Sequence, residues 1–166
     1  MVMNYQEIEA WLNGHDIKHY TISENLSVDV DGDVWLVNRG LTKFPFQFRE
    51  VAGNFMCPCN SLTSLKYAPM IVGMRFYCHV NELTSLQYAP SYVGGSFWCS
   101  HNNLTSVKYL PDYIGGDIKL GDNPFEITED NEREWMDAIV KNSCIYEYIT
   151  NPSDKLKAFY KMLYEV

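Results

Sequence analysis

Apolar positions repeat every 21 residues through the middle of the chain. In register, the complete units are VAGNFMCPCNSLTSLKYAPMI (51–71), VGMRFYCHVNELTSLQYAPSY (72–92) and VGGSFWCSHNNLTSVKYLPDY (93–113). A degraded unit fills 30–50 and a truncated one spans 114–125. One such unit cannot bury its own apolar face, so neighbouring units must stack. The period therefore predicts a solenoid over residues 30–125.

The constant columns of the repeat indicate which side chains fill its core. They are Val51, Val72, Val93 and Ile114; Phe55, Phe76, Phe97 and Ile118; and Cys57, Cys78 and Cys99. In a strand through Phe76-Tyr77-Cys78, the outer two side chains point to one side and Tyr77 to the other. We therefore predict short parallel strands with Phe and Cys inside, and the three cysteines as buried free thiols.

Other repeated residues are expected where each unit turns. Asparagines follow the strands at Asn60, Asn81, Asn102 and Asn123, and a ladder of asparagines can satisfy backbone groups there. Gly94-Gly95 and Gly115-Gly116 are expected to supply backbone freedom before the strand. A tyrosine column, Tyr67, Tyr88 and Tyr109, precedes the Pro of each unit, and we expect it to pack between units.

This pattern resembles leucine-rich repeats, whose core reads L-x-x-L-x-L-x-x-N-x-L. Phe76, Cys78, Asn81 and Leu83 match the last four fixed positions. The short period is similar to the bacterial type found in secreted enteric effectors, and the Val-Gly-Gly-x-Phe-x-Cys phrasing is similar to repeat proteins of bacteriophages and bacteria. The resemblance implies an α+β fold: a right-handed solenoid with a parallel sheet on its concave face. The first Leu position is small here, which implies a thinner interior (Ala52, Gly73, Gly94 and Gly115).

Both ends depart from the repeat and are expected to cap it within one structural domain. Residues 1–29 are predicted to form a helix over 4–13 and the first strand of a hairpin turning at Asp31-Gly32. Residues 126–166 are predicted to form a helical cap. Its first helix would span about 129–142 with Thr128 as cap, and its second would start at Asn151-Pro152 with an apolar stripe of Leu156, Phe159, Tyr160 and Leu163. An alternative is that these helices also bind a partner.

Charge and composition narrow the function classes. The net charge is −8, and the acids gather at the two ends while the repeat is nearly neutral. Repulsion of a phosphate backbone disfavours nucleic acid as partner. No apolar run is long enough for a membrane helix, and the start of the chain does not resemble a secretion signal, so we expect no membrane and a cytoplasmic location.

Catalytic, metal and cofactor sites are not predicted. Cys57-Pro58-Cys59 lacks a second Cys or His pair at zinc-ligand spacing, and Asp29, Asp31 and Asp33 lack the closing Glu of a calcium loop. The enteric effectors carry a ligase with a Cys-x-Asp motif, but Cys144 is followed by Ile145. We therefore do not expect an enzyme.

The candidate site is the column of residues between the buried Phe and Cys positions. It comprises Met56, Tyr77, Trp98 and Lys119, with Arg75, His79 and His101 beside it. Exposed Trp and Tyr have the composition of a protein-binding hot spot. The competing interpretation is that the rings only stabilise the sheet by cross-strand stacking.

These observations lead to three hypotheses. The first is a non-enzymatic module that binds a protein through the concave sheet face; the resemblance to bacteriophage proteins implies an anti-defence role against a host protein in a bacterial cytoplasm. The second is a self-assembling homo-oligomer. The third is a binder of a small molecule or nucleotide through Arg75, His79, Trp98 and His101.

Overall fold

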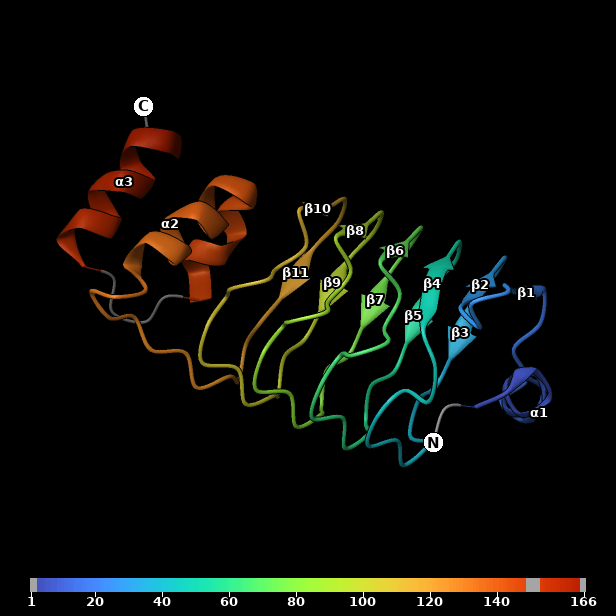
Figure 1. Ribbon diagram of the computed structural model, residues 1–166. Helices are drawn as coiled ribbons and strands as arrows, with labels where there is room; N and C mark the ends of the chain where they lie inside the picture. The colour runs from blue at the N-terminus through green and yellow to red at the C-terminus, as the bar shows by residue number, and fades with distance from the viewer. Residues whose placement is uncertain (1–2, 149–152, 165–166) are drawn as a thin grey trace.

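Each 21-residue unit forms one coil with two short strands (Figure 1). The structure is a computed structural model and describes residues 3–148 and 153–164. The helices are α1 (Tyr5–Gly14), α2 (Glu132–Lys141), the 3-10 helix η1 (Ser143–Tyr148) and α3 (Asp154–Tyr164). The strands are β1 (Tyr20–Ile22), β2 (Val28–Val30), β3 (Val34–Trp35), β4 (Phe48–Val51), β5 (Phe55–Met56), β6 (Ile71–Val72), β7 (Phe76–Tyr77), β8 (Tyr92–Val93), β9 (Phe97–Trp98), β10 (Tyr113–Ile114) and β11 (Ile118–Lys119).

The strands build two sheets on different sides of the coils. Sheet A has the order β1-β2-β4-β6-β8-β10, and sheet B has the order β11-β9-β7-β5-β3. Neighbouring coils pair in parallel, as in Phe55↔Phe76 of sheet B and Val72↔Val93 of sheet A. The predicted α+β parallel-sheet solenoid is confirmed, but the expectation of one sheet is incomplete. The Val column lies in sheet A because each Val and the residue before it form a two-residue strand. This strand pairs in parallel with the equivalent two residues of the neighbouring coil.

The core consists of side chains stacked coil upon coil. Phe55, Phe76 and Phe97 are fully buried, and successive ring centroids lie 5.6 Å apart. The three predicted core cysteines are fully buried free thiols. Burial raises the pKa of the Cys78 thiol, so it stays neutral and packs as a small apolar group. The core columns inferred from the period are confirmed.

The predicted asparagine ladder closes each coil after its sheet-B strand. The buried Asn81 side chain donates from Nδ2 to the carbonyl oxygens of Cys57 and Cys78, both at 3.0 Å. Its Oδ1 accepts from the Leu62 N–H at 3.0 Å. Asn102 repeats this pattern one coil later, with Nδ2 donating to Cys78 and Oδ1 accepting from Leu83. Each amide thus joins two coils and satisfies backbone groups that are shielded from water.

In the coils that follow Ala52, glycine is required between the two strands because the backbones of successive coils approach closely. A Cβ added to Gly94 would lie 2.1 Å from the carbonyl oxygen of Gly73. Gly94 and Gly95 do not have a positive φ, so the expectation that they supply backbone freedom is wrong. The Gly73-Gly94-Gly115 column instead lets successive coils contact each other directly.

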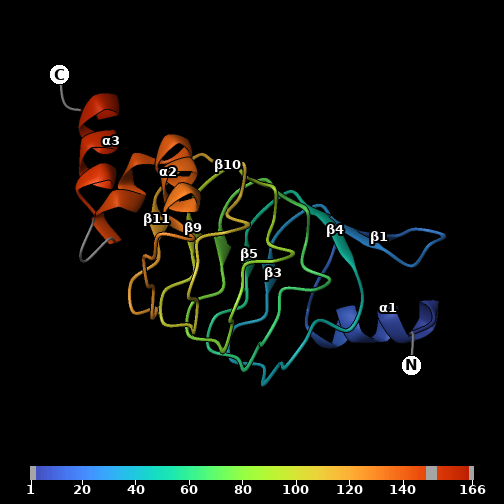
Figure 2. The same ribbon diagram turned by 60° about the vertical axis from the view of Figure 1, so that its left-hand side comes forward.

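The N-terminal helix has the predicted position and caps one end of the solenoid (Figures 1 and 2). Asn4 forms a capping box with Glu7: its Oδ1 accepts from the Glu7 N–H, and Glu7 Oε2 accepts from the Asn4 N–H. Ile8 and Leu12 are fully buried and join the core. The helix therefore covers apolar surface that the first coil would otherwise expose.

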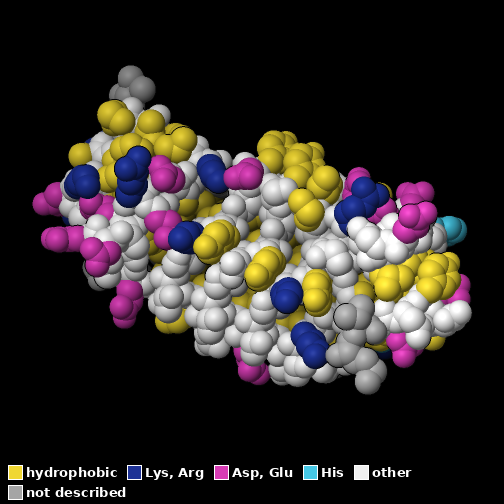
Figure 3. Space-filling view, viewed as in Figure 1, with side chains coloured by type: hydrophobic (Ala, Val, Ile, Leu, Met, Phe, Trp, Pro, Cys, Tyr) yellow, Lys and Arg dark blue, Asp and Glu magenta, His cyan; other side chains and the backbone are white. Residues whose placement is uncertain are grey.

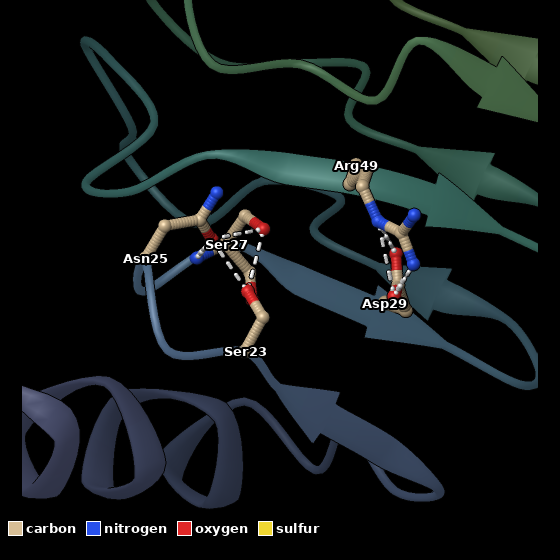
Figure 4. Close-up of polar contacts among 5 residues, drawn as sticks. All are labelled: Ser23, Asn25, Ser27, Asp29 and Arg49. Atoms are coloured by element: carbon tan, nitrogen blue, oxygen red, sulfur yellow. Dashed lines mark hydrogen bonds and ion pairs between the residues drawn. The ribbon is translucent and has the colours of Figure 1, made fainter.

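The predicted hairpin exists but its turn is elsewhere. β2 pairs antiparallel with β1, whereas β3 belongs to sheet B and pairs with β5. Asp31-Gly32 is therefore a corner of the first coil, and the hairpin turn lies at residues 23–27. In that turn the Asn25 Oδ1 accepts from the Ser23 and Ser27 hydroxyls at 2.6 and 2.8 Å (Figure 4). The local Asp-Gly signal fails because Val34 must occupy the Phe column of the coil.

Two helices and a 3-10 turn form the other end of the molecule (Figure 2). α2 starts later than predicted, at Glu132, and Thr128 is not its cap because Asn131 holds that position. The predicted start at Asn151-Pro152 lies outside the described residues. In α3, the Leu156 N–H donates to Ser153 Oγ, and Leu156 is the buried member of the predicted stripe. α3 is tied to α2 by Lys155 and Glu132, whose ion pair lowers the pKa of Glu132.

Candidate partner-binding face

The candidate residues on sheet B stand in one outward column. β-Pairing places Trp35 beside Met56, Met56 beside Tyr77, Tyr77 beside Trp98, and Trp98 beside Lys119. This set is called the sheet-B column below. Trp35 was missed by the sequence interpretation, although aligning the degraded unit 30–50 with unit 51–71 places it in the column.

The inner members of the sheet-B column cover one another. The rings of Tyr77 and Trp98 are stacked, with centroids 4.1 Å apart and planes 5° from parallel. Lys119 Nζ lies 3.9 Å from the Trp98 ring centroid, a cation–π contact on that ring. Met56 is buried, with 6% of its surface exposed. The column therefore presents ring edges to solvent more than ring faces.

Trp35 is the one ring of the column on an end strand of sheet B, because the other end strand, β11, carries Lys119. Trp35 is 52% exposed, and β3 pairs with β5 alone. In β5, the Met56 carbonyl accepts from the Leu36 N–H at 2.7 Å, toward the preceding coil. Trp35 stands 21 residues before Met56, in the same position of its coil. Its backbone N–H and C=O therefore point in the same direction as those of Met56, to the side of β3 on which sheet B has no further strand. This edge combines an exposed indole with backbone groups that can pair with another strand.

A row of polar side chains precedes the sheet-B column along each strand. Asp33 Oδ1 accepts from the Asn54 N–H at 2.7 Å, and Asn54 Oδ1 accepts from the Arg75 N–H at 3.3 Å. Arg75 is exposed and makes no salt bridge within the described residues. Its guanidinium is thus available beside the aromatic column.

The two predicted histidines lie on successive coils but differ in surroundings. His79 is half-buried beside Tyr77 and Trp98, with ring centroids 6.0 and 6.1 Å away. Burial, and then the charges of His101 and Lys119, lower the pKa of His79. His101 is exposed, and its Nε2 lies 3.3 Å from Asp122 Oδ2. Only His79 therefore belongs to the aromatic cluster.

Hydrogen-bonding capacity remains inside this cluster. His79 Nδ1 and Trp98 Nε1 are buried atoms that have no hydrogen-bond partner among the residues that the structure describes. Among the described residues, no three His, Cys, Asp or Glu side chains are grouped closely enough to hold a metal ion. The face thus combines the aromatic column with the cations Arg75 and Lys119 and with the carboxylates of Asp33 and Asp117 in the polar row.

A second column, on sheet A, was not considered from the sequence. Glu50, Ile71, Tyr92 and Tyr113 are paired across β4, β6, β8 and β10 and are called the sheet-A column. Figure 3 shows hydrophobic side chains gathered over β6, β8 and β10. The tyrosine column also differs from expectation: its rings are 39–53% exposed and are not packed away between units (Tyr67, Tyr88 and Tyr109).

Comparisons of the chain with protein families, with characterised proteins and with solved structures give no match. Within the described part of the chain, no helix is both long and apolar enough to cross a membrane. The assignment of a function therefore rests on the faces of the solenoid.

Proposed function

We propose that this chain is a non-enzymatic protein-binding module and that a partner protein docks on the sheet-B column and the open edge at β3. The observation that carries the proposal is the exposure of Trp35 at an unpaired strand edge. Burial of a large indole at the centre of an interface contributes strongly to affinity. A partner strand beside β3 would bury Trp35 and satisfy its backbone groups in one step.

Charged groups around the column support recognition of a protein surface. Arg75 and Lys119 stand on the same face as Trp35 and Tyr77, and arginine is enriched at interface hot spots. The narrower proposal, from the resemblance to bacteriophage repeat proteins, is that the partner is a host or defence protein in a bacterial cytoplasm.

The same edge favours a second candidate function, self-assembly. Two copies of β3 could pair antiparallel around Trp35, which would place Asp31 of one copy opposite Arg39 of the other. Sedimentation velocity at micromolar concentration separates the candidates: a dimer lost in Trp35→Ala supports self-assembly, and a monomer supports a different partner. The nucleotide hypothesis is disfavoured, because Tyr77 and Lys119 occupy the faces of Trp98 on which a base would stack.

The test of the main proposal uses matched aromatic residues. Tagged wild-type chain captures a partner from its native host, and mass spectrometry identifies it. Trp35→Ala and Tyr113→Ala each remove a ring that is 52% exposed, the first from sheet B and the second from sheet A. We expect Trp35→Ala, and the double variant Tyr77→Ala/Trp98→Ala, to reduce partner recovery at least tenfold, and Tyr113→Ala to leave it unchanged. Equal recovery by all three variants would contradict the proposal.

A further inference from the structure

A groove lies at the junction between the N-terminal cap and the first two coils, away from both sheet columns. It has a volume of about 540 Å³ and is bounded by α1, the hairpin turn, residues 42–47 and residues 63–67. A cavity of this size suits one small organic molecule. It lies on the side of the coils that carries Tyr67, whereas the proposed partner site lies on sheet B.

The floor of the groove is apolar. Phe44 and Phe46 are buried beneath it, as is Ile8 of α1. Leu26 of the hairpin turn and Tyr67 of the next coil form its sides. Phe46 occupies the position of the tyrosine column one coil before Tyr67, and Trp11 contacts it edge-on at 5.2 Å. An aliphatic or aromatic body of a ligand would therefore contact ring and methyl groups on several sides.

The rim of the groove is cationic. Lys43 and Lys66 line it, and no Asp or Glu does. Neither lysine makes a salt bridge within the described residues. Because the whole chain carries −8, two lysines without acidic partners at one groove form a local positive site on an acidic protein.

A neutral donor stands at the same rim. The Asn25 Oδ1 accepts three hydrogen bonds, from Ser23 Oγ, Ser27 N and Ser27 Oγ. These contacts fix the orientation of the amide, and Figure 4 shows its nitrogen pointing away from the two serines. Asn25 lines the groove, so its Nδ2 can donate to an anion that the lysines attract.

Tyr67 holds its place at a conformational cost. Its φ is +74°, at the third position of a turn closed by the Ala68 N–H donating to the Leu65 carbonyl at 2.8 Å. Glycine is the residue that this turn position favours. Tyr88 and Tyr109 share this positive φ, so the turn is a feature of the repeat that places the ring of Tyr67 at the groove in this coil.

We propose that this groove binds a small amphipathic anion, a single carboxylate on an aliphatic or aromatic body. The apolar body packs on Phe44, Phe46 and Tyr67, and the carboxylate is bound by Lys43, Lys66 and Asn25. A second groove of about 600 Å³, between the coils and α2, provides a contrast. Its lining cations, Lys108 at the position equivalent to Lys66 together with Arg133 and Lys141, are matched by three acids, Asp112, Glu134 and Asp137.

The probes are 8-anilinonaphthalene-1-sulfonate, an aromatic anion that fluoresces in apolar sites, and dodecanoate below its micelle concentration. We expect saturable fluorescence enhancement with the full chain, and displacement of the dye by dodecanoate but not by dodecyltrimethylammonium, a cation of equal chain length. Lys66→Glu should raise the Kd of both anions at least tenfold. Lys108→Glu, the matched control beside Tyr109, should leave it within twofold of wild type.

Circular dichroism and Tm establish that both variants are folded, and Lys66→Gln removes the charge without reversing it. An intermediate Kd for Lys66→Gln would support a direct electrostatic contact. Equal affinity of wild type and Lys66→Glu, equal loss in Lys108→Glu, displacement by the cationic amphiphile, or no enhancement at all would overturn the proposal.

Discussion

The sheet-A and sheet-B columns come from the same repeat yet differ in burial. On sheet A, Tyr92 and Tyr113 are stacked with centroids 4.9 Å apart, and both remain largely exposed. On sheet B, Tyr77 and Trp98 lie closer, at 4.1 Å, and Lys119 covers the outer ring. A 21-residue period aligns identical positions on every coil, so aromatic stacking alone does not identify a binding site. Both sheets end in an exposed ring on an edge strand, Trp35 on β3 and Tyr113 on β10. Sheet B differs in that its edge ring is an indole and that its face carries Arg75 and Lys119, whereas the sheet-A column contains Glu50.

The largest expected effect comes from the asparagine ladder, which follows the sheet-B strands. Asn81→Ala leaves the buried Leu62 N–H without its side-chain acceptor and removes the amide donor that joins the Cys57 and Cys78 carbonyls of two coils. We expect a loss of about 4 kcal/mol in the free energy of unfolding, measured by urea denaturation. Asn103→Ala, at an exposed position next to Asn102 of the ladder, should change it by less than about 0.5 kcal/mol. Similar losses for both would show that the ladder does not support sheet B.

A methyl group added at Gly94, between the sheet-A strand β8 and the sheet-B strand β9, should lower the stability of both sheets together. In Gly94→Ala, the added Cβ meets the Gly73 carbonyl oxygen at 2.1 Å, so the coils must separate. We expect about 3 kcal/mol of destabilisation. Gly14→Ala is the control, because a Cβ there has no neighbour within 4 Å. A stable Gly94→Ala variant with an unchanged Tm would refute the close contact between coils.

Removal of one ring from each column compares the columns directly. Trp98→Ala loses a half-buried ring held between Tyr77 and Lys119, and should cost about 2 kcal/mol. Tyr92→Ala loses a ring that is 42% exposed, and should cost about 1 kcal/mol or less. Thermal unfolding followed by far-ultraviolet circular dichroism gives both values. The reverse order would mean that sheet A is the better-packed face.

The smallest expected effect is a pH dependence of stability that arises from His79, which lies beside the sheet-B column. The folded-state pKa of His79 is below its ordinary value of 6.5, chiefly because of burial. The unfolded chain therefore binds this proton more readily than the folded chain. Stability from neutral His79 is fully present above about pH 6.5 and declines as the pH falls toward the folded-state pKa. His79→Gln should flatten the fall in the urea midpoint between pH 7.5 and 5.5 relative to wild type. His19→Gln, at an exposed position outside this cluster, is the control.

The sequence predicted the parts of the fold that repeat. Phe55, Phe76 and Phe97, the three cysteines and the asparagines are placed as the period requires. Sheet A was missed because each of its inner strands, such as Ile71–Val72, carries one constant apolar position, whereas each inner sheet-B strand begins a constant Phe-x-Cys pattern. A single constant position shows no alternation, so only pairing across coils reveals the sheet-A strand. The hairpin was misplaced because a local Asp31-Gly32 signal was preferred over the column that contains Val34.

The candidate site was predicted only in part for a related reason. The column Met56, Tyr77, Trp98 and Lys119 follows from alternation along each strand. The isolation of Trp35 and the burial of Met56 depend on which strand ends the sheet, and that depends on how the cap covers the first coil. The exposure of Tyr67, Tyr88 and Tyr109 follows from turns in which each takes a positive φ, which a repeated Tyr does not indicate.

The central claim is that sheet B, and not sheet A, is the partner-binding face. Hydroxyl-radical footprinting with mass spectrometry measures the oxidation rate of individual side chains, with and without the captured partner. We predict that the partner lowers the oxidation rate of Trp35 severalfold and leaves Tyr92 and Tyr113 unchanged. Protection of Tyr92 and Tyr113 with no change at Trp35 would contradict the account.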